Sequence, residues 1–115
     1  ELTPALLERA NFWQRFRGPD LTQHVRRGPV SFVHNLLHMT GAYTPQPFVD
    51  RSAVALFNGE IYNYREIRQT LLEDFEFSTE SDTEVLLNSL ELNGVEKTVE
   101  ILTADFIKVV FYCSV

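Results

Sequence analysis

The sequence predicts one α+β domain, in which antiparallel strands carry helices on one outer face. Its 115 residues are 44% hydrophobic and 23% charged, a balance that is typical of a soluble globular domain. Segments of strand and helix pattern are interspersed, but residues 30–57 resemble hairpins and lack the regular strand–helix alternation of a parallel sheet. We therefore expect residues 1–115 to form a single domain.

The first element is a helix that follows Thr3-Pro4. Thr3 is a suitable N-cap, and Pro4 suits the first helical position because its missing N–H costs nothing there. The helix should end near Phe16, before Gly18-Pro19. Its aromatic residues, Phe12, Trp13 and Phe16, allow two interpretations, a patch that faces a partner or ordinary packing of the helix on a sheet.

Strand signals follow this helix. Arg27-Gly28-Pro29 is typical of a turn, and residues 30–39 predict the second arm of a hairpin. Residues 44–47 form a proline-rich loop. The apolar run 52–57 has the length of a buried strand and stops at Asn58-Gly59, the strongest turn dipeptide in the sequence.

Helical spacing returns after this corner. A helix is expected over 63–73, and Phe75 and Phe77 alternate as a short strand would. Ser81-Asp82-Thr83-Glu84 predicts a capping box, with the Ser81 hydroxyl on the Glu84 N–H and the Glu84 side chain reaching back.

The helix that this box starts should end at Asn93-Gly94, and a further short helix is expected over 95–102. Residues 106–113 are apolar at alternate and intervening positions alike, which favours a central strand.

Charge and cysteine content exclude several classes of function. The net charge is −6, and residues 30–115 carry five basic and thirteen acidic side chains. Such a surface repels phosphate backbones and anionic lipid, so we expect no nucleic acid and no membrane as partners. No apolar run approaches the ~18 residues of a membrane span. A single cysteine allows no internal disulfide, and a cytoplasmic location is expected.

Two side-chain types that often carry chemistry give weak signals. Cys113 lies in an apolar strand without a basic neighbour, which favours a core thiol over a nucleophile. His34 and His38 share one face of a strand, but no third ligand is evident. Structural histidines are therefore the favoured interpretation, and no metal site is expected.

An amide, a glycine and a carboxylate stand in succession at Asn58-Gly59-Glu60, the kind of corner where oxyanion donors occur. On turn chemistry alone this run predicts an ordinary turn, and Ser81-Asp82-Thr83-Glu84-Val85 alone predicts an ordinary capped helix. Together, however, the two runs closely resemble the class II (N-terminal nucleophile) glutamine amidotransferase domain of the asparagine synthetase family. The motifs that match this family, in the family's order, are Arg17-Gly18-Pro19-Asp20, His34, Gln46-Pro47, Phe57 to Glu66 and Ser81 to Leu87.

The stretch Leu37-His38-Met39-Thr40-Gly41, with residues 44–47 after it, looks most like the asparagine synthetase domain-containing proteins. The resemblance covers nearly the whole chain and implies an Ntn-hydrolase-like sandwich of antiparallel sheets between helix layers.

The resemblance also implies a chemistry and a set of site residues. In this family an N-terminal Cys attacks the side-chain amide of glutamine, and the thioester is hydrolysed to glutamate as ammonia leaves. By resemblance, Asn58 and Gly59 form the oxyanion hole, and Glu60 and Asp82 bind the α-ammonium group of glutamine.

Two departures from the family pattern predict that this chain is inactive. Only 16 residues precede Arg17, so we expect the first strand, with its nucleophilic Cys, to be missing and the sandwich to be incomplete. The arginine that should bind the substrate carboxylate, two residues after His34, is Leu36. Glutamine should then bind weakly or not at all.

The chain also lacks the Gly-rich, serine-containing loop of the synthetase half, so no cofactor is expected, and asparagine formation would need a synthetase domain or another protein partner. Three interpretations stay open: a degenerate, non-catalytic scaffold or partner-binding module, which is favoured; the glutaminase half of an active synthetase whose Cys strand is not included; and a truncated product without an independent role.

Overall fold

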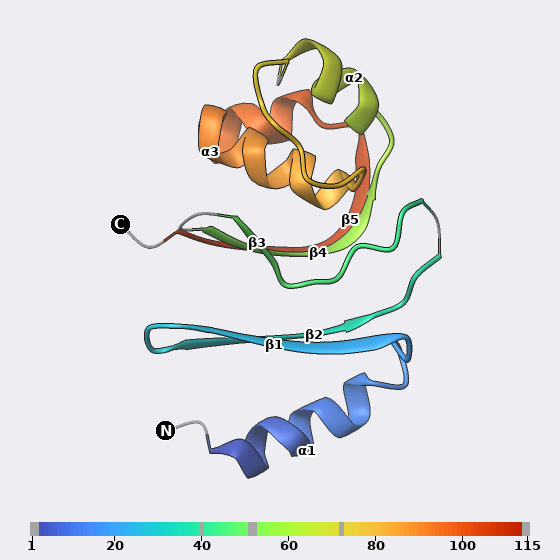
Figure 1. Cartoon of the computed structure of the whole chain (residues 1–115), viewed down its shortest axis with the longest axis vertical. Helices are drawn as coiled ribbons and strands as arrows, with labels where there is room; N and C mark the ends of the chain where they lie inside the picture. The colour runs from blue at the N-terminus through green and yellow to red at the C-terminus, as the bar shows by residue number, and fades with distance from the viewer. Residues whose placement is uncertain (1–2, 40, 51–52, 72, 114–115) are drawn as a thin grey trace.

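The computed structural model describes residues 3–39, 41–50, 53–71 and 73–113, with side chains described up to residue 104. Four layers are stacked in it (Figure 1): a helix, a two-stranded sheet, a three-stranded sheet and a pair of helices. The α+β class is confirmed. Helices cover both outer faces of the sheet pair, so the expectation from the residues alone of helices on one face was wrong.

The first layer is α1, Pro4–Gln14, which starts as predicted. The Thr3 hydroxyl accepts a hydrogen bond from the Leu6 N–H at 3.4 Å, which satisfies one of the free donors of the first turn. No residue of α1 is buried. The aromatic residues of the C-terminal part of α1 and the turn after it are exposed and stack on one another edge to face: Phe12, Trp13 and Phe16.

The second layer is the predicted hairpin, β1 Leu21–Arg27 and β2 Val30–Leu36. Gly28 has a φ of 55° in its turn, which only glycine adopts at low cost. The segment before β1 is fixed to the end of β2 by a close approach at Gly18. A Cβ atom on Gly18 would lie 2.0 Å from the Asn35 carbonyl oxygen, so no larger residue fits there.

The third layer is a sheet in the order β3-β4-β5, formed by β3 Phe48–Asp50, β4 Ala53–Ile61 and β5 Ala104–Cys113. All pairs are antiparallel. The prediction of a central C-terminal strand was wrong for the part of the chain that is described, because β5 pairs there with β4 alone and β4 is central. Cys113 pairs with Ala53, but its side chain lies outside the described ones.

The predicted turn at Asn58-Gly59 was also wrong. β4 runs through this dipeptide to Ile61, and the sheet register shifts at it, since Asn58 pairs with Lys108 and Gly59 with Phe106. A β-bulge thus replaces the corner. Bulges bend strands and increase their twist, and β4 and β5 do curve toward α2 at this end (Figure 1).

The fourth layer comprises α2, Tyr64–Thr70, and α3, Asp82–Ile101. α3 is bent where its predicted end lies, because Gly94 has a φ of 73° and interrupts the helix. The predicted strand at Phe75 and Phe77 was wrong. These residues lie in the connection between the two helices, and both rings pack against the cluster of Ile67 and Val85.

The main core lies between β4 and α3. Phe57 and Ile61 pack there against Leu86 and Leu90, and Ala53 and Ala55 pack against Leu87. Because side chains alternate along a strand, Val54, Leu56 and Asn58 project from the opposite face of β4, toward the hairpin. Phe32 and Leu36 of β2 are buried. Asn58 therefore lies on the face of β4 that is turned toward the hairpin.

Candidate functional site

A cavity of about 630 Å³ opens between the end of β2, the bulge of β4 and the beginning of α3. We call it the inter-sheet cavity. Its hairpin wall includes Arg17, His34, Leu36 and His38, its β4 wall Phe57, Asn58, Gly59 and Glu60, and its helix wall Ser81, Asp82 and Thr83. All four residues predicted to bind substrate, Asn58, Gly59, Glu60 and Asp82, thus line a single cavity. Their roles stay predictions.

The β4 wall presents a short run of polar groups. Asn58, Gly59 and Glu60 are all exposed, although the residues on either side of the run, Phe57 and Ile61, are buried. The buried flanks fix the backbone of the run in the sheet. The backbone of the run is therefore restrained by the sheet, and its exposed groups face the cavity.

Asp82 belongs to the helix wall and is tied to the end of β4. Its Oδ2 accepts a hydrogen bond from the Ile61 N–H at 3.1 Å, and its Oδ1 lies 3.5 Å from the Thr83 hydroxyl. Burial raises the pKa of Asp82, although the hydrogen bonds from Ile61 and Thr83 act in the opposite direction. A cation in the cavity would favour the ionised form of this carboxyl group.

Gln46 lines the cavity and also links its walls, a role that the sequence did not indicate. This buried side chain accepts a hydrogen bond from the Phe57 N–H at 2.7 Å, and its amide nitrogen lies 3.4 Å from the Thr83 hydroxyl. It therefore links the loop before β3, strand β4 and helix α3. The available signal was the Gln46-Pro47 match to the family, which carried no indication of what the amide contacts.

The hairpin wall is mostly apolar at its centre, where Leu36 is 8% exposed. Arg17 is the single arginine or lysine among the described residues that line the cavity. Its neighbour Asp20 joins the turn to β2: the Asp20 N–H donates to the Leu36 carbonyl at 3.0 Å, and Asp20 Oδ2 accepts from the His38 N–H at 2.7 Å.

The two histidines of this wall have different surroundings. Burial lowers the pKa of His34, so its imidazole is neutral near neutral pH. His38 is exposed, and its ring meets that of Tyr43 edge to face at 5.4 Å. In the part of the chain that the structure describes, no three His, Cys, Asp or Glu side chains gather as metal ligands would.

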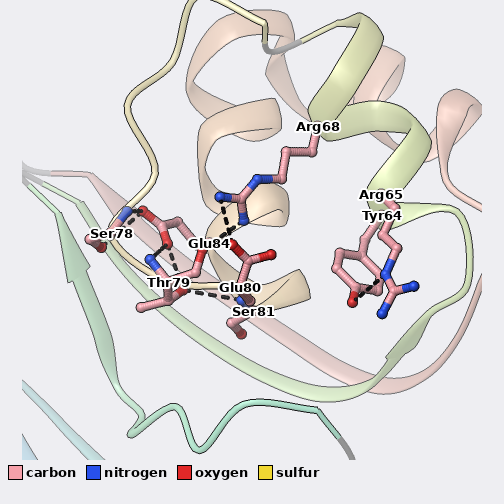
Figure 2. A network of polar contacts seen from close by, with 8 residues as sticks. All are labelled: Tyr64, Arg65, Arg68, Ser78, Thr79, Glu80, Ser81 and Glu84. Carbon is pink, nitrogen blue, oxygen red and sulfur yellow. Dashed lines mark hydrogen bonds and ion pairs between the residues drawn. The ribbon is translucent and has the colours of Figure 1, made fainter.

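The start of α3 is capped differently from the predicted box. The Ser81 hydroxyl accepts from the Thr83 N–H at 3.1 Å, not from the Glu84 N–H. Glu84 reaches past Ser81 to Ser78 and Thr79, and its carboxylate accepts hydrogen bonds from their N–H and hydroxyl groups (Figure 2). The sequence identified the capping residues correctly, but the turn before the helix is longer than a capping box assumes.

Comparison with known families decides the relationship of this chain. The family model described as "Glutamine amidotransferase domain" matches residues 2–113. The chain belongs to this family. The glutamine amidotransferase domain thus covers the inter-sheet cavity and all of its walls, and the resemblance seen in the motifs is confirmed.

Individual relatives of this glutamine amidotransferase domain agree. A protein of Methanocaldococcus jannaschii is 40% identical over 81 residues, 69% of this chain and 14% of that protein. Asparagine synthetase [glutamine-hydrolyzing] 2 of Bacillus subtilis is 37% identical over 83 residues, 70% of this chain and 11% of the relative. Asparagine synthetase [glutamine-hydrolyzing] of Asparagus officinalis is 36% identical over 95 residues, 80% of this chain and 16% of the relative.

The chain therefore matches only a small part of these relatives, between 11% and 16% of their length. Within the described residues of the domain, no helix combines the length and the apolar character needed to cross a bilayer.

Proposed function

We propose that this chain is the glutamine amidotransferase domain of an asparagine synthetase-like protein, with an Ntn-hydrolase-like fold, and that the inter-sheet cavity is its glutamine pocket. The main observation behind this proposal is that one cavity is lined by residues from two elements of the chain, Asn58, Gly59 and Glu60 of β4 and Asp82 of α3. Similarity to glutamine-hydrolysing asparagine synthetases supports the proposal.

The chemistry of the walls suits an amino acid that carries an amide. The Asn58 amide and the Gly59 N–H act as neutral donors to the oxygen of the glutamine side-chain amide, where negative charge develops during attack. Glu60 and Asp82 supply two carboxylates for the α-ammonium group. Charge-assisted hydrogen bonds of this kind are about twice as strong as neutral ones.

The opposite wall is less suitable for the substrate carboxylate. Leu36 stands where the family resemblance places an arginine, and a buried aliphatic side chain offers no hydrogen bond. An unpaired carboxylate that loses its water is disfavoured. No cysteine is among the described cavity-lining residues. We therefore assign weak glutamine binding and no hydrolysis to these residues, which leaves the cavity as part of a scaffold or regulatory module beside a synthetase domain.

A second candidate function is the glutaminase half of an active synthetase. It is favoured by the exposed Asn58 amide, which lies on strand β4 at the cavity. This function requires a cysteine to reach the cavity from a segment outside residues 1–115. The two candidates differ in whether glutamine is bound firmly, so binding is the property to measure.

Calorimetric titration of glutamine and of a simple primary amine tests the proposal. The unmodified chain should bind glutamine weakly or undetectably, and it should bind the amine at least as tightly. Leu36→Arg should raise the affinity for glutamine alone because it restores a partner for the substrate carboxylate. Leu6→Arg makes the same change on the exposed face of α1, outside the cavity, and should improve neither ligand. Thermal unfolding establishes that both variants are folded.

Tight glutamine binding by the unmodified chain, with no gain from Leu36→Arg, would contradict the assignment at Leu36. Another group would then hold the carboxylate, and Arg17 is the lining arginine available for it.

A further inference from the structure

Residues 78–81 connect the α2 side of the molecule to the inter-sheet cavity. We call them the 78–81 segment. Ser81 and Asp82 at its end line the inter-sheet cavity, and Ser78 to Glu80 line a smaller cavity beside Tyr43. The segment lies outside regular secondary structure. Its conformation therefore depends on side chains that hold it in place.

Glu84 is the first of these side chains. It is 4% exposed and lies in the first turn of α3. Its Oε1 accepts from the Ser78 N–H at 2.8 Å and the Ser78 hydroxyl at 3.0 Å, and its Oε2 accepts from the N–H of Thr79 at 2.7 Å and from its hydroxyl (Figure 2). Both carboxylate oxygens are thus used twice. Neither a neutral amide nor a shorter acid can reproduce all four contacts.

Arg68 of α2 holds the same segment from the other side. Its Nη1 donates to the Thr79 carbonyl at 2.7 Å, and its guanidinium lies 4.1 Å from the centre of the Phe77 ring. An ion pair at 3.3 Å joins it to Glu80, whose side chain is 75% exposed. Exposed ion pairs contribute little, so the backbone hydrogen bond and the ring contact are the restraining interactions.

Asp82 follows this restrained segment directly. Its carboxylate accepts from the Ile61 N–H of β4 and from the Thr83 hydroxyl, and its backbone continues the segment that Glu84 and Arg68 restrain. Because the Asp82 backbone leaves this segment directly, loosening the segment should shift Asp82 and weaken its bond to the Ile61 N–H without unfolding the sheet.

We propose that Glu84 and Arg68 are positioning residues, which hold the 78–81 segment so that the Asp82 carboxylate faces the inter-sheet cavity and binds the α-ammonium group of an amino-acid ligand. The choice of ligand rests on the proposed function, whereas the placement of Asp82 does not. Glu84 acts from within α3 and Arg68 from α2, so the geometry of the ammonium site depends on the packing of these two helices.

Amide hydrogen exchange, followed by NMR, tests the placement without any ligand. Glu84→Gln should raise the exchange rate of the Ile61 amide at least about tenfold, because a lost set of charge-assisted hydrogen bonds corresponds to one or more powers of ten in a local opening equilibrium. The amide of Ala55, in the middle of β4, should keep its rate. Glu80→Gln removes only the exposed ion pair and is the matched control, with no change at Ile61.

Two further variants separate positioning from general destabilisation. Ser78→Ala removes one hydroxyl donor to Glu84 and should raise the Ile61 exchange rate by a smaller factor, again without a change at Ala55. This variant tests the proposal if Glu84→Gln does not fold. Arg68→Met should raise the Ile61 exchange rate and Arg68→Lys should restore it in part. Unchanged Ile61 exchange in folded Glu84→Gln, or an equal rise at Ala55 and Ile61, would overturn the proposal.

The ligand is tested separately in the Leu36→Arg background by calorimetry with glutamine. Adding Glu84→Gln should weaken glutamine binding about tenfold, and adding Glu80→Gln should leave it unchanged. If Ile61 exchange responds but glutamine affinity does not, then Glu84 does position Asp82, and the assignment of glutamine to the cavity is the part that fails.

Discussion

Asp82, the first residue of α3, accepts a hydrogen bond from the backbone N–H of Ile61, the last residue of β4, at 3.1 Å. Asn58 lies three residues before Ile61 on the same strand. This contact therefore ties the carboxylate of α3 to the strand that carries Asn58. The two halves of the proposed substrate site are joined by the backbone of the strand that carries one of them.

Substitution of Asp82 by asparagine should make stability less dependent on pH. Burial raises the pKa of Asp82, so the folded state holds this proton more tightly than the unfolded chain does. The stabilisation from this tighter proton binding is fully present below the ordinary pKa of an aspartic acid, near pH ~4, and is lost as the pH rises through the pKa of the folded state. The asparagine side chain can still accept from the Ile61 N–H without a charge. Urea unfolding at a series of pH values from acid to neutral should show that the free energy of unfolding of the variant rises relative to wild type as the pH rises. A relative rise toward acid pH would contradict this.

Glu84 should show the opposite pH dependence. Burial alone would raise the pKa of Glu84, but the hydrogen bonds from Ser78 and Thr79 outweigh burial and hold the pKa below its usual value. The stabilisation is present above the ordinary range, near pH ~4.3, and is lost as the pH falls through the folded pKa. We expect Glu84→Gln to cost about 1.5–3 kcal/mol at neutral pH. In the same urea series this cost should shrink toward acid; a constant cost would show that the charge of Glu84 is not what matters.

Gly18→Ala should destabilise the domain much more than Gly28→Ala. The new Cβ at residue 18 would lie 2.0 Å from the Asn35 carbonyl oxygen, a backbone atom that cannot move alone. We expect a loss of about 3 kcal/mol or more. Gly28 has open space around it, so an alanine there meets no clash. Its cost is that of placing a Cβ-bearing residue in the left-handed conformation, about 1–2 kcal/mol. Thermal unfolding of both variants gives the comparison, and equal losses would show that the turn into β1 can relax.

Replacement of Gln46 by Ala should leave the buried Phe57 N–H without its acceptor and remove the amide donor to the Thr83 hydroxyl oxygen. The expected cost is about 1–3 kcal/mol in urea unfolding. Gln69→Ala, on the exposed side of α2, is the matched control and should stay within about 0.5 kcal/mol of wild type. A loss at Gln46 no larger than at Gln69 would mean that water replaces the lost contacts.

The sequence identified the helix-end signals at Thr3, Ser81 and Gly94, although the Ser81 hydroxyl accepts from the Thr83 N–H and not from Glu84 as predicted. Thr3, Ser81 and Gly94 determine the ends and the bend of their helices through contacts or dihedral angles that involve nearby residues. Asn58-Gly59 predicts a turn on local chemistry, although the same two residues also suit a bulge. The choice between the two depends on pairing with Phe106 and Lys108, far along the chain in β5, which a local pattern does not contain.

The candidate site shows the same division. Family resemblance identified Asn58, Gly59, Glu60 and Asp82, and the structure places all four around one cavity. The residues that hold them are Gln46, Arg68 and Glu84. Gln46 acts across 11 and 37 positions of the chain, Arg68 across 11, and Glu84 through an unusual turn before its helix. The spacing after Ser81 indicated that Glu84 reaches back toward the helix start, but nothing in the sequence pattern indicated its partners Ser78 and Thr79, or the contacts of Gln46 and Arg68.

The last prediction concerns catalysis. A protein that contains residues 1–115 and no cysteine at the inter-sheet cavity should release no glutamate or ammonia from glutamine above a buffer control, because the described walls supply oxyanion donors and carboxylates but no thiolate. Asn58→Ala should then change nothing. Turnover that Asn58→Ala abolishes would refute the inactive assignment and establish the glutaminase alternative, since removal of one oxyanion donor typically costs about 10²–10³-fold. Turnover that is indifferent to Asn58→Ala would instead indicate a contaminating glutaminase, which repeated purification should remove. If the natural upstream segment carries a cysteine that reaches the cavity, adding it should give more glutaminase activity in Leu36→Arg than in the unmodified chain.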